Sequence, residues 1–470
     1  MVCLYFMAIL CVDVINMAFF VSKSNINVSN RIEMTSFVVG LSAYLRINIY
    51  TKYLPLRQAT KLHIACCIIF LTYLSKVEGQ LNAYYEKVET GKIEIPFEYF
   101  HDFIVLDVIF QKKLPLKFIL DTGAGSTVLF KKEYAELLQM PYHKKIKLLG
   151  SDLSKDVFAY VCNNTSLQLV NLSPVAHNVI VLEEDFLFIE EYTGMKVDGI
   201  LGAEFFKGMI IKIDYRNKLL TLIKPVDFLP KKYKDYTSFD IDVINHKPYL
   251  TTTTEVNPGV TTQTRLLIDT GAAITALFHD NTDSTIVLKS QVVKGNLGAG
   301  LGGNIEGYSG KIHRLHLGPY QFNNMISSFQ SLDDAILNDD KIVRNGLLGN
   351  LLLERFQMVL DFHHKKLYLK PYKNYNKEFE FDKSGLTIFA FGQDLNQFYV
   401  KHVIDGSPAD EAGILPGDII LKVGYWSYRW FDLRRLNKKL SGKVGKTIHL
   451  RLKREGQIIN TSFVLRDLFT

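Results

Sequence analysis

From about residue 94 onward, short apolar runs alternate with polar turns, and long helical periodicities are few. The runs Phe103–Phe110 and Leu114–Leu120, joined by Gln111-Lys112-Lys113, are typical of a β-hairpin. A short amphipathic helix is expected over residues 131–138. Further strands are expected at residues 157–161, 167–170, 179–181, 210–215, 219–222, 358–362 and 367–369. The pattern therefore predicts a mostly β protein.

The hairpin leads into Asp121-Thr122-Gly123, and the same motif returns as Asp269-Thr270-Gly271 after a second apolar run. Each copy is followed by an apolar-apolar-Gly segment, and 81 positions separate Asp121 from Gly202 while 80 separate Asp269 from Gly349. Asp214 and Asp361 form a third matched pair, because Asp214 lies 93 positions after Asp121 and Asp361 lies 92 positions after Asp269. Such matched spacing indicates an internal duplication.

An acid at the end of a strand, followed by Thr-Gly, places a carboxylate on a tight turn with close backbone approach. Two such turns related by pseudo-symmetry would bring two carboxylates face to face, and the pair would share one proton because both cannot easily ionise. One carboxylate can then act as general base on a water while its protonated partner polarises a carbonyl. These residues predict peptide hydrolysis without a metal, a cofactor or a covalent intermediate.

Over about residues 94–372 the chain resembles two-lobed aspartic proteases of the pepsin/retropepsin superfamily. The resemblance implies lobes at residues 94–235 and 236–372, with Asp121 and Asp269 as the catalytic dyad. It also implies loop support from Thr122, Gly123, Thr270 and Gly271. A non-catalytic peptide-binding protein on the same scaffold is the alternative, and the intact pair of aspartates favours the enzyme.

Two features refine this resemblance. Ala124 and Ala272 stand where pepsins usually carry a hydroxyl that would donate to the carboxylate and lower its pKa, so we expect an activity optimum less acidic than pepsin's. The Gly-rich residues 295–304 are expected to form a hairpin or flap, with residues 149–152 as the first-half equivalent. Tyr160 and Tyr308 are both candidates for a flap aromatic residue.

After a linker at residues 373–382, the run from Gly406 to Ile420 (Gly-Ser-Pro-Ala-Asp-Glu-Ala-Gly-Ile-Leu-Pro-Gly-Asp-Ile-Ile) resembles a bacterial protease-associated PDZ domain, over about residues 383–468. The resemblance implies a small β-barrel-like module with one or two helices, one of them at residues 432–440. It implies a carboxylate-binding loop, and hence a C-terminal peptide ligand, at Gly385, Leu386, Thr387 and Ile388. The alternative is a module that only packs on the protease as a lid.

Residues 1–80 predict a signal or anchor region. Arg57 and Lys61 precede an apolar run from Leu62 to Leu74, and a small residue, Gly79, offers a cleavage point before Gln80. We expect an exported protein that is periplasmic, at the cell surface or secreted, or alternatively one anchored in the membrane through residues 1–75.

The resemblance implies polypeptide partners, and the composition argues against nucleic acid and metal. The formal charge of +7 over 470 residues is mild, and the basic residues lack a nucleic-acid-binding motif, so nucleic acid is not an expected partner. Of the five cysteines only Cys162 lies beyond residue 70, and no metal-ligand spacing occurs, so no metal is expected and the globular part must be held by its core.

Overall fold

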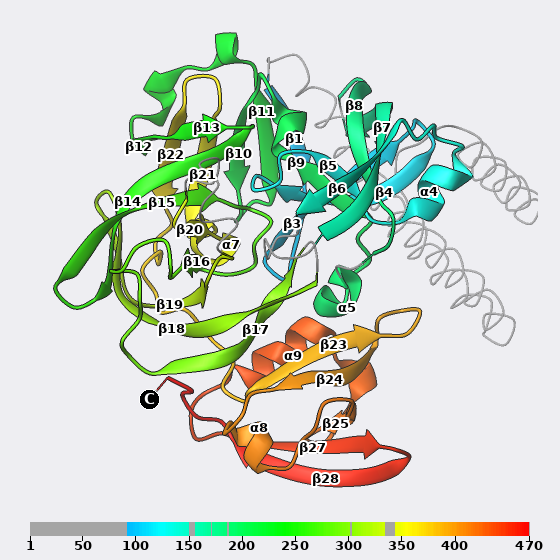
Figure 1. The fold of residues 1–470 in the computed structure, drawn as a ribbon, viewed down its shortest axis with the longest axis vertical. Helices are drawn as coiled ribbons and strands as arrows, with labels where there is room; N and C mark the ends of the chain where they lie inside the picture. The colour runs from blue at the N-terminus through cyan, green and yellow to red at the C-terminus, as the bar shows by residue number, and fades with distance from the viewer. Residues whose placement is uncertain are drawn as a thin grey trace, which may run out of the picture. The chain divides into compact units, whose positions relative to one another are not determined.

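The computed structural model describes residues 92–469 except 150–155, 171, 186–187, 301–302 and 334–343. The described chain is mostly β, as the hydrophobic pattern predicts, and its short helices lie between strands (Figure 1). The signal or anchor region expected over residues 1–80 lies outside the described residues.

The first eight-stranded sheet carries the predicted hairpin as β3 and β4, its second and third strands from one edge. One strand, β7, replaces the two strands expected at residues 157–161 and 167–170, because Asn164 takes a positive φ of 53° within a β-bulge and the ladder continues past it. The short helices α4 (Lys132–Leu137), α5 (Ile189–Thr193) and η3 (Ala203–Phe206) lie between strands of this lobe. The strands in spatial order are β2 (Glu98–Phe100), β3 (Phe103–Phe110), β4 (Leu114–Asp121), β9 (Gly199–Gly202), β5 (Thr127–Leu129), β8 (Val175–Leu182), β7 (Asp156–Leu169) and β6 (Lys144–Leu149).

The second eight-stranded sheet repeats this order strand for strand. Even the additional pairing is kept, since β14 contacts β18 as β3 contacts β7. A short helix, α7 (Asn350–Leu353), follows β20 at the place where η3 follows β9. In spatial order the strands are β13 (Asp242–Ile244), β14 (Lys247–Asn257), β15 (Val260–Ile268), β20 (Gly346–Leu348), β16 (Ala276–His279), β19 (Tyr320–Gln330), β18 (Gly303–Leu317) and β17 (Val292–Gly300).

A six-stranded sheet joins the lobes, because β10 of the first half pairs antiparallel with β21 of the second from Ile210 opposite Asp361 to Ile213 opposite Met358. Two 3-10 turns, η4 (Pro225–Asp227) and η5 (Pro230–Tyr233), connect the halves. The strands in spatial order are β1 (Lys92–Pro96), β11 (Leu219–Ile223), β10 (Ile210–Asp214), β21 (Phe356–Asp361), β22 (Lys366–Pro371) and β12 (Thr237–Asp240).

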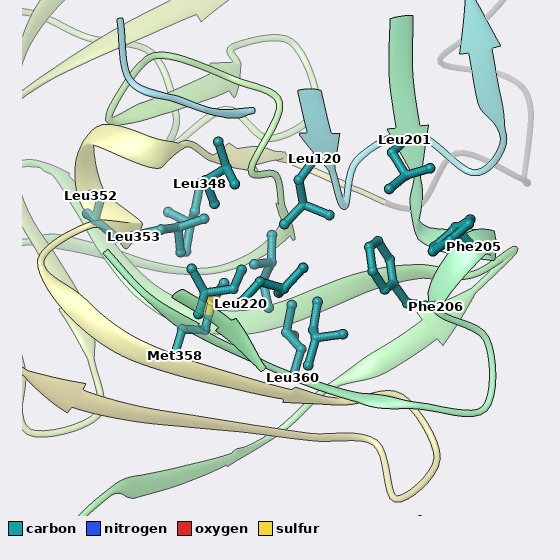
Figure 2. Packing of buried hydrophobic residues seen from close by; sticks show 14 of the residues in the cluster. Leu120, Leu201, Phe205, Phe206, Leu220, Leu348, Leu352, Leu353, Met358 and Leu360 are labelled. Atoms are coloured by element: carbon teal, nitrogen blue, oxygen red, sulfur yellow. The ribbon is translucent and has the colours of Figure 1, made fainter. Parts of the chain in front are cut away.

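One continuous apolar cluster contains residues from both lobes and from the sheet that joins them. Figure 2 shows Leu120 and Leu348, one from each lobe, above Met358 and Leu360 of β21. All four side chains are almost fully buried. Because Leu120 and Leu348 lie directly before Asp121 and Gly349, this core supports the strand ends that carry the Asp-Thr-Gly loops.

The C-terminal sheet has its own apolar core, distinct from that of the lobes. Its edge strand is β23, and helix α9 is capped by Asp432, whose carboxylate accepts from Arg435 N. The elements are β23 (Leu386–Phe391), β24 (Gln397–Val403), α8 (Pro408–Glu411), β25 (Ile419–Val423), β26 (Trp426–Ser427), η6 (Tyr428–Trp430), α9 (Leu433–Leu440), β27 (Thr447–Arg454) and β28 (Gln457–Val464).

Candidate active site

Each Asp-Thr-Gly motif begins where a central strand of its sheet ends. Asp121 is the last residue of β4 and lies beside Gly202 of the parallel strand β9. Asp269 directly follows β15, and its backbone N–H donates to Leu348 O of β20 at 2.9 Å. The same strand pairing therefore fixes the position of both acids.

The two apolar-apolar-Gly segments run directly against the loops that follow the acids. A Cβ added to Gly202 would lie 2.4 Å from Ser126 O, and one added to Gly349 would lie 2.2 Å from Ile274 O. Any side chain at either position would push the loop away from the strand, so both positions require glycine.

The two loops meet with their acids facing each other. A Cβ added to Gly123 would lie 2.5 Å from Asp269 Cγ, and one added to Gly271 would lie 2.3 Å from Asp121 Cγ. Each carboxyl group therefore lies over the glycine of the opposite loop. This reciprocal packing brings together the two acids that the sequence motif singles out.

Thr122 and Thr270 connect the loops through four buried hydrogen bonds. The Thr122 hydroxyl donates to Ile268 O at 2.7 Å and accepts from the Thr270 N–H at 3.1 Å. The Thr270 hydroxyl donates to Leu120 O at 2.8 Å and accepts from the Thr122 N–H at 3.0 Å. Both side chains are fully buried, so the lobes are held together directly beneath the acids.

The two acids have unequal surroundings. Asp121 accepts the N–H groups of Gly123 at 2.7 Å and Ala124 at 2.8 Å, whereas Asp269 accepts that of Gly271 at 2.8 Å. Burial raises the pKa of both carboxyl groups, and the charge on Asp121 raises the pKa of Asp269 further, well above its usual range. The additional amide donor therefore favours the ionised form of Asp121.

Asn350 supports the second loop, although no sequence motif identifies it. Its side-chain amide donates to Thr270 O at 3.0 Å and to Asp102 O at 2.7 Å, and its carbonyl accepts from the Tyr215 hydroxyl at 2.6 Å. The corresponding residue of the first lobe is Ala203. The only sequence signal at this position is a polar residue between Gly349 and the apolar run that follows, and it does not by itself indicate this role.

Two hairpins, β6–β7 and β17–β18, occupy the places where flaps were expected. The Gly-rich residues 295–304 lie within β17 and β18, which pair antiparallel as predicted, while both hairpin tips lie outside the described residues. The Tyr160 hydroxyl donates to Glu183 and that of Tyr308 to Asp280, each at 2.8 Å. Both tyrosines are thus tied to carboxylates of their own lobes, and the flap aromatic residue stays a prediction.

The predicted carboxylate-binding loop begins the edge strand of the C-terminal sheet, since Leu386, Thr387 and Ile388 lie in β23 beside helix α9. Gly385 has a φ of +83°, and its N–H donates to Asp382 Oδ2 at 2.5 Å. The Ser384 N–H also donates to this oxygen, and the Leu386 N–H donates to the Ser384 hydroxyl. The protein's own side chains therefore occupy the amides that a ligand carboxylate would use.

The two lobes contact the same module, in part at the groove between β23 and α9. The Tyr192 ring of α5 packs edge-to-face on Phe389 with centroids 5.9 Å apart. A Cβ added to Gly194 would lie 3.2 Å from Leu433 Cβ of α9, and Lys311 pairs with Asp467 at 2.8 Å. The module therefore packs on the two lobes, and part of this contact lies at one end of its groove.

The rest of the groove opens into a cavity of about 820 Å³. Ile388 and Lys438 line it from the C-terminal module, and Ala273, Ile274 and Leu297 line it from the second lobe. Ala273 and Ile274 belong to the loop that begins at Asp269, so the cavity borders this loop, while neither acid is among its lining residues.

The described residues contain no group of three or more His, Cys, Asp or Glu side chains suited to holding a metal ion. No helix in this part of the chain has the length and apolar character needed to span a membrane.

Comparison with known proteins gives two family matches. Residues 106–205 match the aspartyl protease family model, and residues 399–427 match a PDZ domain model. A probable CtpA-like serine protease of Staphylococcus saprophyticus is 30% identical over 138 residues, which are 27% of this chain and 26% of that protein. The chain thus spans about a quarter of that relative's length. A crystal structure of an aspartic proteinase from Irpex lacteus aligns with a TM-score of 0.39 and 15% identity, over 61% of this chain and 99% of that chain.

Proposed function

We propose that this chain, which combines a two-lobed aspartyl protease fold with a C-terminal PDZ domain, is an aspartic endopeptidase that uses Asp121 and Asp269. The observation that carries this proposal is the reciprocal packing of the two acids. Each lies over the glycine of the opposite loop, and the buried threonine bonds hold them there.

The unequal hydrogen bonding supports a division of roles. Ionised Asp121 accepts a proton from a water molecule, whose oxygen adds to the peptide carbonyl carbon, while Asp269 donates its proton to the carbonyl oxygen. The tetrahedral adduct collapses as its C–N bond breaks and Asp121 passes the proton to the leaving amine. Asp269 recovers its proton from the adduct's hydroxyl, so both acids end in their starting states.

Hydrolysis of a mixed peptide library by the purified full-length protein tests the proposal, with mass spectrometry of the products. We expect cleavage by the wild type and a loss of at least about a thousandfold in Asp121→Asn and Asp269→Asn, because each acid serves in the same bond-making step. A matched control is Asp283→Asn, which changes an exposed acid of the second lobe. If the wild type and both dyad variants behave alike, the chain is the non-catalytic peptide-binding alternative.

The pH–rate profile is a second test. Since Ala124 and Ala272 provide no hydroxyl to the carboxylates and burial raises the pKa of both acids, the optimum should lie above that of pepsin. A maximum below about pH 3, well under the usual aspartate pKa, would contradict this expectation.

For the PDZ domain we propose that it orients the polypeptide substrate by taking an extended segment beside the edge strand β23. The cavity between β23 and the second lobe supports this role because a segment held there lies next to the loop of Asp269. Cleavage of long, unfolded polypeptides should depend on the domain more strongly than cleavage of short peptides. A Leu386→Lys variant, which charges a buried position of β23, should lower the first rate selectively, with exposed Ile458→Lys as the control.

We further propose export, directed by residues 1–80. Mass spectrometry of the mature amino terminus would show cleavage near Gly79 in an exported form, whereas an intact terminus in the membrane fraction would indicate an anchored form.

A further inference from the structure

Two cations of the second lobe lie beside the proposed dyad. The strands β14 and β15 run antiparallel, and Tyr249 is opposite Leu267. Lys247, two residues before Tyr249, is therefore level with Asp269, two residues after Leu267. Lys247 Cε lies 3.5 Å from the position of a Cβ on Gly125. The side chain thus reaches from the second lobe to the loop that carries Asp121.

Arg344 is the second cation. It stands two residues before Gly346 of β20, which pairs with Leu266 of β15. The Arg344 guanidinium interacts electrostatically with Asp269 and Tyr249. It also interacts with Lys247, and burial together with this like charge lowers the pKa of the lysine. The two cations therefore share one region around the acids.

Among the described residues, neither cation has a hydrogen-bonding or ion-pair partner. Arg265 of the neighbouring strand provides the contrast, because it pairs with Asp242 at 2.7 Å. Both Lys247 and Arg344 are partly buried, and a partly buried charge is costly unless an opposite charge compensates it. The dyad supplies about one negative charge to two positive ones, so the region retains an excess positive charge.

The duplication shows that the fold itself does not require these cations. Strand pairing makes Phe103 the first-lobe equivalent of Lys247, since Val105 is opposite Ile119 as Tyr249 is opposite Leu267. It likewise makes Val197, two residues before Gly199, the equivalent of Arg344. Both equivalents are buried apolar core residues. One side of the dyad is therefore apolar and the other cationic.

We propose that Lys247 and Arg344 form a subsite that selects polypeptides with an Asp or Glu side chain next to the scissile bond, on the second-lobe side. A substrate carboxylate placed there would compensate the excess positive charge in a region where water screens it weakly. This inference rests on the proposed endopeptidase function and adds its substrate preference.

Cleavage sites from a peptide library digested by the full-length wild type give the first test, and we expect enrichment of Asp and Glu at one position. Matched peptides that carry Glu or Gln there should then differ about tenfold in kcat/KM for the wild type. The Glu/Gln ratio should approach one in Lys247→Met and Arg344→Met. It should stay at the wild-type value in Lys366→Met, a control whose lysine pairs with exposed Asp240.

Salt provides a readout that needs no variant. Raising NaCl from about 50 mM to about 500 mM should lower the wild-type Glu/Gln ratio several-fold, because ions screen the added attraction. Cleavage without acidic enrichment, or a Glu/Gln ratio unchanged in both variants and by salt, would overturn the subsite while leaving the endopeptidase intact. No cleavage of any library peptide would instead overturn the proposed function itself.

Discussion

Replacing Thr270 by valine should loosen the dyad while keeping the shape of the buried side chain. The hydroxyl donates to Leu120 O and accepts from the Thr122 N–H, and all of these groups are buried between the lobes. The substitution leaves one buried carbonyl and one buried N–H without partners, at about 1 to 3 kcal/mol each. We therefore expect the free energy of unfolding to fall by about 3 kcal/mol.

The same change should reduce activity in the protein that remains folded. Without the bonds from Thr270, the loop of Asp269 is free to shift against that of Asp121, and a displacement of about 1 Å costs on the order of a hundredfold in rate. Thr270→Ser keeps the hydroxyl and should retain most of both stability and activity.

Urea denaturation and kcat/KM, measured on the same preparations well below the unfolding midpoint, separate the two effects. The control is Thr254→Val, which removes a buried hydroxyl that bonds to Thr264 at 2.6 Å within β14 and β15. It should lower stability by about 1 kcal/mol with little effect on kcat/KM. If Thr270→Val loses no more activity than Thr254→Val, the threonine bonds do not position the dyad.

Three other changes test the surroundings of the site. Gly123→Ala should abolish peptide hydrolysis while the chain still folds, because the added methyl group would lie 2.5 Å from Asp269 Cγ; activity within threefold of wild type would contradict the reciprocal packing. Burial raises the pKa of Asp102 to about 7, so its ionisation opposes folding increasingly from about pH 4 to pH 7. Asp102→Asn should thus raise the free energy of unfolding at pH 8 by about 2 kcal/mol and change it little at pH 4. The value at pH 8 is half of the full linkage value because the residue is partly exposed. Equal gains in the free energy of unfolding at both pH values would refute this. Asp382→Ala should free the Gly385 N–H to bind a ligand carboxylate. Fluorescence anisotropy of this variant should show tighter binding of a peptide with a free C-terminal carboxylate than of the same peptide with a C-terminal amide. The difference between the two peptides should be small in the wild type.

The acids and their strands could be predicted because their signals are local. Each Asp-Thr-Gly motif needs only an apolar strand before it and a turn after it, and the chain repeats both at matched spacing. The hairpin of β3 and β4 follows from the same local pattern of apolar and polar residues. The strands β10 and β21 were also expected, but their pairing, which joins the halves, was not. The mostly β, two-lobed fold was therefore accessible from the sequence.

The contacts that support the acids were not accessible, because they join distant parts of the chain. Asn350 bonds to the backbone of Thr270 and Asp102 and to the hydroxyl of Tyr215, which are separated from it by 80, 248 and 135 positions. Asp382 was assigned to a linker, although its carboxylate fills the loop of the next domain. The hydrogen-bond partner of such a polar residue cannot be predicted from the sequence, because only the fold brings the two residues together.

A departure from the duplication accompanies the different roles proposed for the two acids. Two identical loops would give two equivalent carboxyl groups, and a proton shared evenly between them would leave base and acid undefined. The loops differ in the number of amide donors, since Asp121 accepts from Gly123 and Ala124 while Asp269 accepts from Gly271. Because hydrogen bonds to a carboxylate favour its ionised form, the additional donor favours ionisation of Asp121, which is the base in the proposed mechanism. In the proposed mechanism, a departure from symmetry at one backbone N–H thus sets the direction of proton transfer.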